Sequence, residues 1–252
     1  MKRLRTMISW TGGALVFVAI AAVIVVCPGL CRRSHWESQL KRLCRTLVHV
    51  FGYQVRVSGT AQLPQTGGYV LVCNHVNLMD AFLLFGYLPG SFRGLEQLQH
   101  FSWPVYGALT RRFGNIALDQ SGGGRTAEAL MTAGSALKDG ISLVMFPEGH
   151  RTRDGRLGPF MRGAFRLAAR TDAVLVPVVQ RGAWDIFHKG AREVSPGLVD
   201  LIVLAPWTAD CRAGLDDTTF CARVRQEMDT SFNQNPGPGP DCPDCPDALS
   251  ST

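Results

Sequence analysis

Two stretches decide the fold: YVLVCNHVNLMD (residues 69–80) and ISLVMFPEGHR (residues 141–151). Each begins with an apolar run as long as a buried strand and then changes abruptly to polar residues. Further apolar runs at 174–179 (VLVPVV) and 199–204 (VDLIVL) predict two more strands, and 115–118 predicts a weaker fifth. Helical patterns at 126–137 and 160–170 separate these strands. This alternation predicts one α/β domain over residues 55–232, with a largely parallel central sheet flanked by helices.

Composition excludes several protein classes and favours an anionic partner. The 252 residues are 46% hydrophobic and only 18% charged, which argues against disorder for the bulk of the chain. The net charge is +6, and the segment 233–252 holds three aspartates and no base, so the remainder carries +9. Most of the basic residues are arginines, which suit phosphate binding. We exclude the Pro/Gly/Asp-rich segment 233–252 from the fold.

Eight cysteines are scattered along the chain, several of them within apolar runs. A disulfide framework normally has a denser pattern in a smaller chain, so we interpret them as reduced thiols. The CPDC segment near the carboxyl terminus has no second pair of ligands beside it, and no metal site is expected.

Residues 7–26 form an uncharged apolar segment long enough to cross a membrane. A signal peptide is the alternative, but the apolar run continues past any cleavage site, so residues 1–33 are predicted to be a retained anchor. Bases flank both sides, with a small excess after the segment that favours a cytoplasmic main domain. The segment either crosses the bilayer or dips into one leaflet.

Residues 34–54 are predicted to form an amphipathic helix. Trp36, Leu40, Leu43, Leu47 and Phe51 recur near helical spacing, and the bases lie off that stripe. Such a helix either lies on an anionic membrane surface or packs its apolar stripe on the main core.

Ligands of parallel α/β sheets bind beyond the carboxyl ends of the strands, so the segments after the strands are candidate sites. His75 and Asp80 follow the first apolar run, five residues apart across a strand-to-helix turn. A carboxylate that accepts a proton from one imidazole nitrogen leaves the other nitrogen free as a general base. The alternative is that Asp80 only caps a helix.

The segment after residue 146 combines charged groups with glycines. Arg151, Arg153 and Arg156 are candidates for phosphate binding, with Glu148 orienting one of them and Gly149 allowing close backbone approach. A solvated turn is the alternative. Pro177, inside its apolar run, suggests a strand end or an edge position.

Together these segments resemble the lysophospholipid acyltransferase family over roughly residues 55–207. Asn74-His75-x4-Asp80 matches the catalytic motif of that family, Phe146-Pro147-Glu148-Gly149-x-Arg151 its acceptor-binding motif, and Val176-Pro177-Val178 its proline motif. The resemblance implies a glycerolipid-acyltransferase-type domain that transfers a fatty acyl chain from acyl-CoA or acyl carrier protein to a membrane lysolipid. It implies catalytic roles for His75 and Asp80, and substrate-binding roles for Pro147, Glu148, Gly149, Arg151, Asp119 and Pro177. It implies no cofactor.

The sequence departs from the family pattern at two positions. Gln120 follows Asp119 where the family usually has Arg, and His150 stands where Thr is usual. The first departure removes a guanidinium expected to reach the phosphate of the acceptor; Arg111, Arg112 or Arg125 are candidate replacements. The resemblance implies lysophosphatidic acid as the acceptor. The missing arginine motivates the alternative, which is lyso-ornithine lipid or another lysophospholipid.

Other function classes fit less well. A hydrolase is disfavoured because no Gly-x-Ser-x-Gly turn occurs. Nucleic-acid binding is disfavoured because no recognisable module is present. A non-catalytic lipid-binding protein of the same fold stays open. Arg162, Arg166 and Arg170 recur at four-residue steps and either meet donor phosphates or form a solvated helix face.

Overall fold

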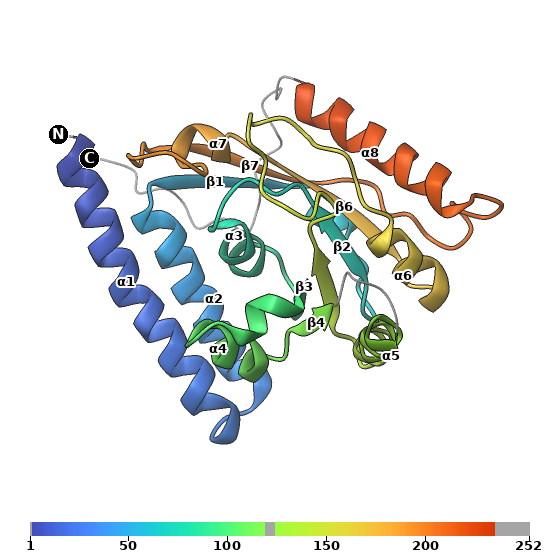
Figure 1. Cartoon of the computed structure of the whole chain (residues 1–252), viewed down its shortest axis with the longest axis horizontal. Helices are drawn as coiled ribbons and strands as arrows, with labels where there is room; N and C mark the ends of the chain where they lie inside the picture. Colours follow the sequence, from blue (N-terminus) through green and yellow to red (C-terminus); the bar gives the residue numbers. More distant parts are fainter. Residues whose placement is uncertain (1, 119–123, 235–252) are drawn as a thin grey trace.

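The structure is a computed structural model that describes residues 2–118 and 124–234. Seven strands form one sheet in the order β1-β7-β6-β2-β5-β3-β4 (Figure 1). The strands are β1 (Tyr53–Ser58), β2 (Val70–Cys73), β3 (Phe92–Gln97), β4 (Ile116–Leu118), β5 (Ser142–Met145), β6 (Leu175–Arg181) and β7 (Gly197–Val203). All neighbouring pairs are parallel except β6 and β7, which confirms the predicted α/β fold with a largely parallel sheet.

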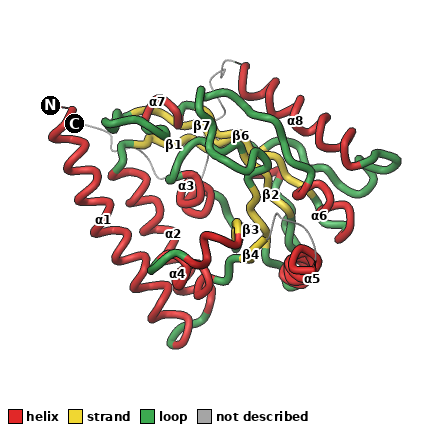
Figure 2. Tube along the Cα trace, in the orientation of Figure 1, coloured by secondary structure: helices red, strands yellow, loops and turns green. Residues whose placement is uncertain are grey.

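Helices cover both faces of the sheet (Figure 2). The helices are α1 (Lys2–Val26), α2 (Arg33–Val50), α3 (Asp80–Tyr87), α4 (Tyr106–Phe113), α5 (Gly124–Lys138), α6 (Gly163–Thr171), α7 (Ala183–Ile186) and α8 (Asp217–Asn233). Helices α1 to α4 and α7 pack on one face, and α5, α6 and α8 pack on the other. Strand β2 feeds both cores, because Leu71 and Cys73 point to the first face while Val70 and Val72 point to the second.

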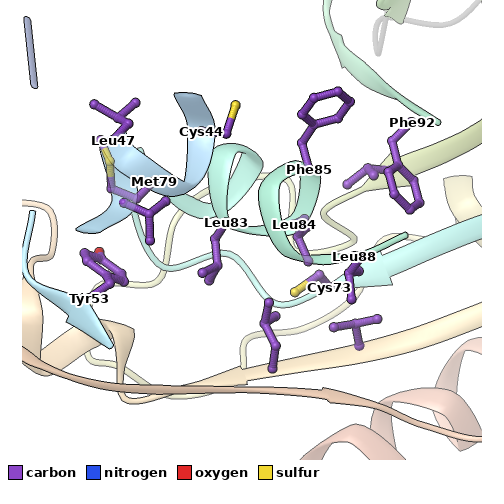
Figure 3. Close-up of a cluster of buried hydrophobic side chains, with 14 of the residues drawn as sticks. Cys44, Leu47, Tyr53, Cys73, Met79, Leu83, Leu84, Phe85, Leu88 and Phe92 are labelled. Atoms are coloured by element: carbon purple, nitrogen blue, oxygen red, sulfur yellow. The ribbon is translucent and has the colours of Figure 1, made fainter. Parts of the chain in front are cut away.

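The first core is thickest around α3, which lies between α2 and the sheet. Figure 3 shows Leu83 and Leu84 of α3 between Cys44 and Leu47 of α2 and Cys73 of β2. All five side chains are almost fully buried. Because Asp80 is the first residue of α3, this packing also fixes the helix that carries the candidate carboxylate.

The amphipathic helix predicted at 34–54 exists as α2, but its apolar stripe packs on the protein core. Trp36, Leu40 and Leu47 are at most 6% exposed. Of the two possibilities stated for this stripe, packing on the core is therefore correct, and its apolar face is not available to a membrane.

Five strands were predicted from apolar runs and all five are present, whereas β1 and β3 were not predicted. Neither position suggested for Pro177, a strand end or a sheet edge, is correct, since Pro177 lies inside β6 and β6 lies inside the sheet between β7 and β2. The proline fits there because β7 ends at Val203 and the carbonyl of Pro177 accepts from Leu204 N at 2.9 Å. Proline has no N–H to donate, and Pro177 lies just beyond the last paired residues of β6 and β7, Val178 and Val203, so no ladder hydrogen bond is lost.

Candidate active site

His75 and Asp80 lie together at the carboxyl end of β2. His75 Nδ1 is 2.7 Å from Asp80 Oδ2, and the same oxygen accepts from Val76 N at 2.6 Å and from Asn77 N at 2.9 Å. Asp80 is 1% exposed, at the amino terminus of α3, where a negative charge is favourable. The predicted approach of the two side chains across the turn is therefore present in the structure.

The geometry fixes the tautomer of His75. Its hydrogen bond to the carboxylate places a proton on Nδ1, which leaves the Nε2 lone pair to accept one. The ring stacks on Phe146, with centroids 4.2 Å apart and planes inclined by 18°, and its side chain is 23% exposed. An oriented and partly open imidazole of this kind suits a general base.

Two asparagines hold the candidate catalytic turn, residues 74–79 between β2 and α3, in place. Asn74 and Gln180 bond each other reciprocally: Asn74 Nδ2 donates to Gln180 O, and Gln180 N and Nε2 donate to the side chain and backbone oxygens of Asn74, all within 2.9 Å. Asn77 Nδ2 donates to Tyr53 Oη at 2.7 Å and to Phe187 O at 2.6 Å. The turn is thereby tied to β6 on one side and to β1 and the segment after α7 on the other.

Burial raises the pKa of the Tyr53 phenol, with the nearby Asp80 charge acting in the same direction. The phenol therefore stays neutral and serves as an acceptor for the Asn77 amide. The sequence identified Asn74 only as part of the motif around His75 and gave no sign of the roles of Asn77 and Gln180, because the partners of all three residues are far away along the chain.

The loop after β5 meets the catalytic turn through Glu148. Its Oε1 accepts from His75 N at 2.8 Å, and its Oε2 accepts from Gly158 N at 2.9 Å. Burial raises the pKa of Glu148, while these two N–H groups act in the opposite direction. The expectation that Glu148 orients an arginine is wrong for the described contacts, since both oxygens are taken by backbone donors. Glu148 instead joins the two loops.

The remaining residues of the predicted acceptor motif lie on the same loop. Thr152 N donates to His75 O at 2.8 Å, so its neighbour Arg151, half-buried, is held beside the catalytic turn. Gly149 has φ +72°, and an added Cβ would lie 2.2 Å from Met161 Cε. Pro147 is buried, and its carbonyl accepts from Met161 N at 2.7 Å.

Other predicted residues lie elsewhere. Pro177 is buried within β6. Asp119 and Gln120 lie outside the described residues. Arg112 is at the opposite end of the sheet, where its Nη2 donates to Val25 O at 3.3 Å, and Arg111 donates to the carbonyl of Phe101. Arg112 is therefore not placed to replace the missing arginine near His75, and the side chain of Arg125 lies outside the described residues.

Two of the arginines at and in α6, Arg162 and Arg166, lie on a solvated helix face. Arg166 Nε lies 3.1 Å from Asp217 Oδ2, and Arg162 Nη1 donates to Thr218 Oγ1 at 3.2 Å. Both contacts reach the amino terminus of α8, so these two side chains join helices on the solvent surface.

A histidine oriented by a buried carboxylate at the carboxyl end of a parallel sheet is an arrangement suited to general-base catalysis. The chain belongs to the family described as Acyltransferase, which matches residues 54–181.

Its relatives include human 1-acyl-sn-glycerol-3-phosphate acyltransferase alpha, 28% identical over 229 residues, with 88% of this chain and 78% of the human protein covered. The chloroplastic 1-acyl-sn-glycerol-3-phosphate acyltransferase BAT2 of Brassica napus is 31% identical over 183 residues, covering 72% of this chain and 52% of that protein. The crystal structure of the 1-acyl-sn-glycerophosphate acyltransferase PlsC from Thermotoga maritima has the same fold, with a TM-score of 0.74 over 92% of this chain and 96% of that one, at 21% identity.

Proposed function

We propose that this protein transfers a fatty acyl chain from an acyl thioester to the free hydroxyl of a membrane lysolipid, with 1-acyl-sn-glycerol-3-phosphate as the first candidate acceptor. The observation that carries the proposal is the 2.7 Å contact between His75 Nδ1 and Asp80 Oδ2, which leaves Nε2 available to a substrate. The names of the relatives supply the acceptor.

The proposed reaction has one chemical centre. His75 Nε2 takes the hydroxyl proton as the acceptor oxygen attacks the thioester carbonyl, and the buried Asp80 stabilises the resulting imidazolium. When the tetrahedral intermediate collapses, the C–S bond breaks and the thiolate leaves with the proton from His75. The acceptor oxygen is itself the nucleophile, so no acyl-enzyme forms. The donor is acyl-CoA or acyl carrier protein, and the chemistry needs neither a metal nor a cofactor.

Arg151, beside the catalytic turn, is proposed to bind the acceptor head group. Gly149 brings the backbone close to the same place, and Pro147 and Glu148 fix the loop that carries both. Asp119 and Pro177 keep the substrate-binding roles that the family resemblance implies for them; buried in β6, Pro177 would act by shaping the sheet.

A second acceptor class is favoured by Gln120. A glutamine at this position lacks the charge of the usual arginine, and that loss matters less for an acceptor without a phosphomonoester, such as lyso-ornithine lipid.

The membrane contact is proposed to be monotopic. Helix α1 is long enough to cross a bilayer, but it is joined to the catalytic domain near both ends: Thr6 Oγ1 accepts from Val194 N at 3.0 Å, and Val25 O accepts from Arg112. A spanning α1 would draw Val194 and Arg112 to opposite sides of the membrane. The exposed apolar face of α1 therefore lies in one leaflet, and the bases at both of its ends suit the head-group layer on the cytoplasmic side.

An acceptor panel tests the proposal. Purified protein is incubated with labelled acyl-CoA and each of lysophosphatidic acid, lysophosphatidylcholine and lyso-ornithine lipid, and the products are identified by lipid mass spectrometry. Acylation of lysophosphatidic acid alone would support the first acceptor and contradict the argument from Gln120. Acylation of no lysolipid would contradict the enzyme and favour a lipid-binding protein of the same fold.

A further inference from the structure

A basic pocket lies at the amino-terminal end of the parallel strands, opposite the end that carries His75. It occupies about 400 Å³ between the connection from α1 to α2, the end of α4 and the outer face of α5. Its lining residues are Pro28, Cys31, Arg33, Trp36, Arg93, Arg112, Phe113, Gly114, Ile116, Thr132, Ala136 and Ile141. Three of them are arginines, and none of the described lining residues is acidic. The volume is within the range of small-molecule sites in proteins.

One buried acid next to the pocket does not neutralise these arginines. Glu37 Oε1 accepts from Arg93 Nη2 at 2.7 Å and from Arg33 Nε at 3.0 Å. Burial works against the charge of Glu37, but the two guanidinium groups outweigh it and lower the pKa of this carboxyl. A single carboxylate thus serves two guanidinium groups. With Arg112, whose described bond is to the neutral carbonyl of Val25, the pocket keeps two excess positive charges.

Arg93 is a rigid part of the floor. Its side chain is 6% exposed, its guanidinium lies 4.3 Å from the centroid of Phe113, and Nη1 donates to Phe92 O at 2.6 Å. Arg33 and Arg112 are exposed, and each uses only one N–H group in a described hydrogen bond, so their other N–H groups can donate to a ligand. The pocket therefore combines a buried floor formed by Arg93 and Phe113 with two exposed cations, an arrangement suited to a phosphate group.

The mouth of the pocket is next to the apolar surface that we assign to the membrane. Val25, Val26 and Leu30 are 54%, 53% and 76% exposed, and they flank the same connection that supplies Pro28 and Cys31. A ligand with a phosphate head and acyl chains could place its head in the pocket and its chains along α1. A soluble anion would not use that neighbouring apolar surface.

We propose that this pocket binds the head group of an anionic phospholipid of the surrounding bilayer, at a site separate from the catalytic one. The phosphate would be held by Arg33 and Arg112 over the floor formed by Arg93 and Phe113. Bound lipid would fix the connection between α1 and α2 at the depth of the head groups. The site goes beyond the proposed acyl transfer, because no atom of the pocket lies near His75.

The test measures lipid binding by titration calorimetry with the full chain in neutral maltoside micelles. The probes are dihexanoyl phosphatidylglycerol, dihexanoyl phosphatidylcholine, coenzyme A and inorganic phosphate. The pocket variant is Arg33→Gln with Arg112→Gln. The matched control is Arg3→Gln with Arg32→Gln, which removes the same charge from exposed sites at the ends of α1 and α2 but not from the pocket.

We expect the pocket variant to bind phosphatidylglycerol at least tenfold more weakly than the wild type, and the control to stay within twofold. Thr132→Trp, which fills the pocket and removes no charge, should weaken binding as strongly as the arginine variant. Equal losses in the pocket variant and the control would mean diffuse attraction and would overturn the proposal. Binding of phosphatidylcholine, coenzyme A or inorganic phosphate as tight as that of phosphatidylglycerol would also overturn it.

Folding and catalysis serve as separate checks. All three variants should melt within a few degrees of the wild type, since every substituted residue is exposed. Acyl transfer to a micellar lysolipid should be retained in the pocket variant. Retained transfer with lost phosphatidylglycerol binding supports the pocket, whereas absent transfer in the wild type would contradict the proposed function and leave the binding result valid.

Discussion

The substitution Asp80→Asn tests the contribution of the negative charge of Asp80 separately from the hydrogen-bond geometry around His75. Asp80 Oδ2 receives three donors, and an asparagine oxygen can accept the same three. Oδ1 has no hydrogen-bond partner among the described residues, so the amide nitrogen of the variant can occupy that position without displacing a donor. The substitution therefore removes one negative charge and leaves the side-chain shape unchanged.

The magnitude follows from the distance. A carboxylate and an imidazolium whose charge centres lie about 4 Å apart interact by about 4 kcal/mol at an effective dielectric constant near 20. Part of this survives as a neutral hydrogen bond, so we expect the variant to lose about 3 kcal/mol of transition-state stabilisation. That loss corresponds to roughly two orders of magnitude in kcat.

The assay follows thiol release from acyl-CoA in the presence of saturating lysolipid, with circular dichroism to confirm the fold. Asp185→Asn, an exposed aspartate on α7, is the matched control and should keep normal turnover. A loss of less than tenfold in a folded Asp80→Asn variant would refute the idea that a buried charge stabilises the imidazolium.

Three further predictions concern the groups around this pair and one buried lysine. Glu148→Gln should lower kcat at least tenfold with little change in melting temperature, because the amide oxygen can accept from only one of the two donors, His75 N and Gly158 N. The matched control is Glu128→Gln, at an exposed position on α5, which should have no effect. Asn74→Ala should lower the free energy of unfolding by about 2 to 4 kcal/mol in urea titrations, because it leaves polar groups of the buried Gln180 without partners, and a change below 0.5 kcal/mol would contradict this. Burial lowers the pKa of Lys41 to about 8, so the protein releases a proton on folding between about pH 8 and 10. The free energy of unfolding of the wild type should therefore rise relative to that of Lys41→Met, by about 1 to 3 kcal/mol, as pH increases through this range. A fall in this stability difference would contradict the lowered pKa of Lys41.

Strong local patterns made most of the fold predictable from the sequence. The strands β2, β5, β6 and β7 are short apolar runs that can be buried on both faces of a sheet, and such runs have few alternatives. The strand β3 (FRGLEQ) was missed because it carries an arginine, a glycine and a glutamate. The buried Arg93 depends on a bond to Glu37 of α2, and that partner lies 56 residues away in the sequence.

The contact between His75 and Asp80 was predictable for a different reason: both residues lie within one turn of chain, so their spacing alone brings them together. The role of Glu148 could not be predicted, because it depends on which backbone N–H groups lie next to its carboxylate once β2 and β5 pair. The stripe on α2 shows the same limit. Its periodicity identified the helix, but only the tertiary arrangement decides whether an apolar face meets lipid or protein.

The most direct test of the central claim is the turnover of His75→Ala with an accepted lysolipid and acyl-CoA. General-base catalysis by His75 would contribute roughly 10²- to 10⁴-fold. We therefore expect the variant to fold with an unchanged melting temperature and to lose at least two orders of magnitude in kcat. Near-normal acyl transfer by the folded variant would contradict the assignment of His75 as the general base.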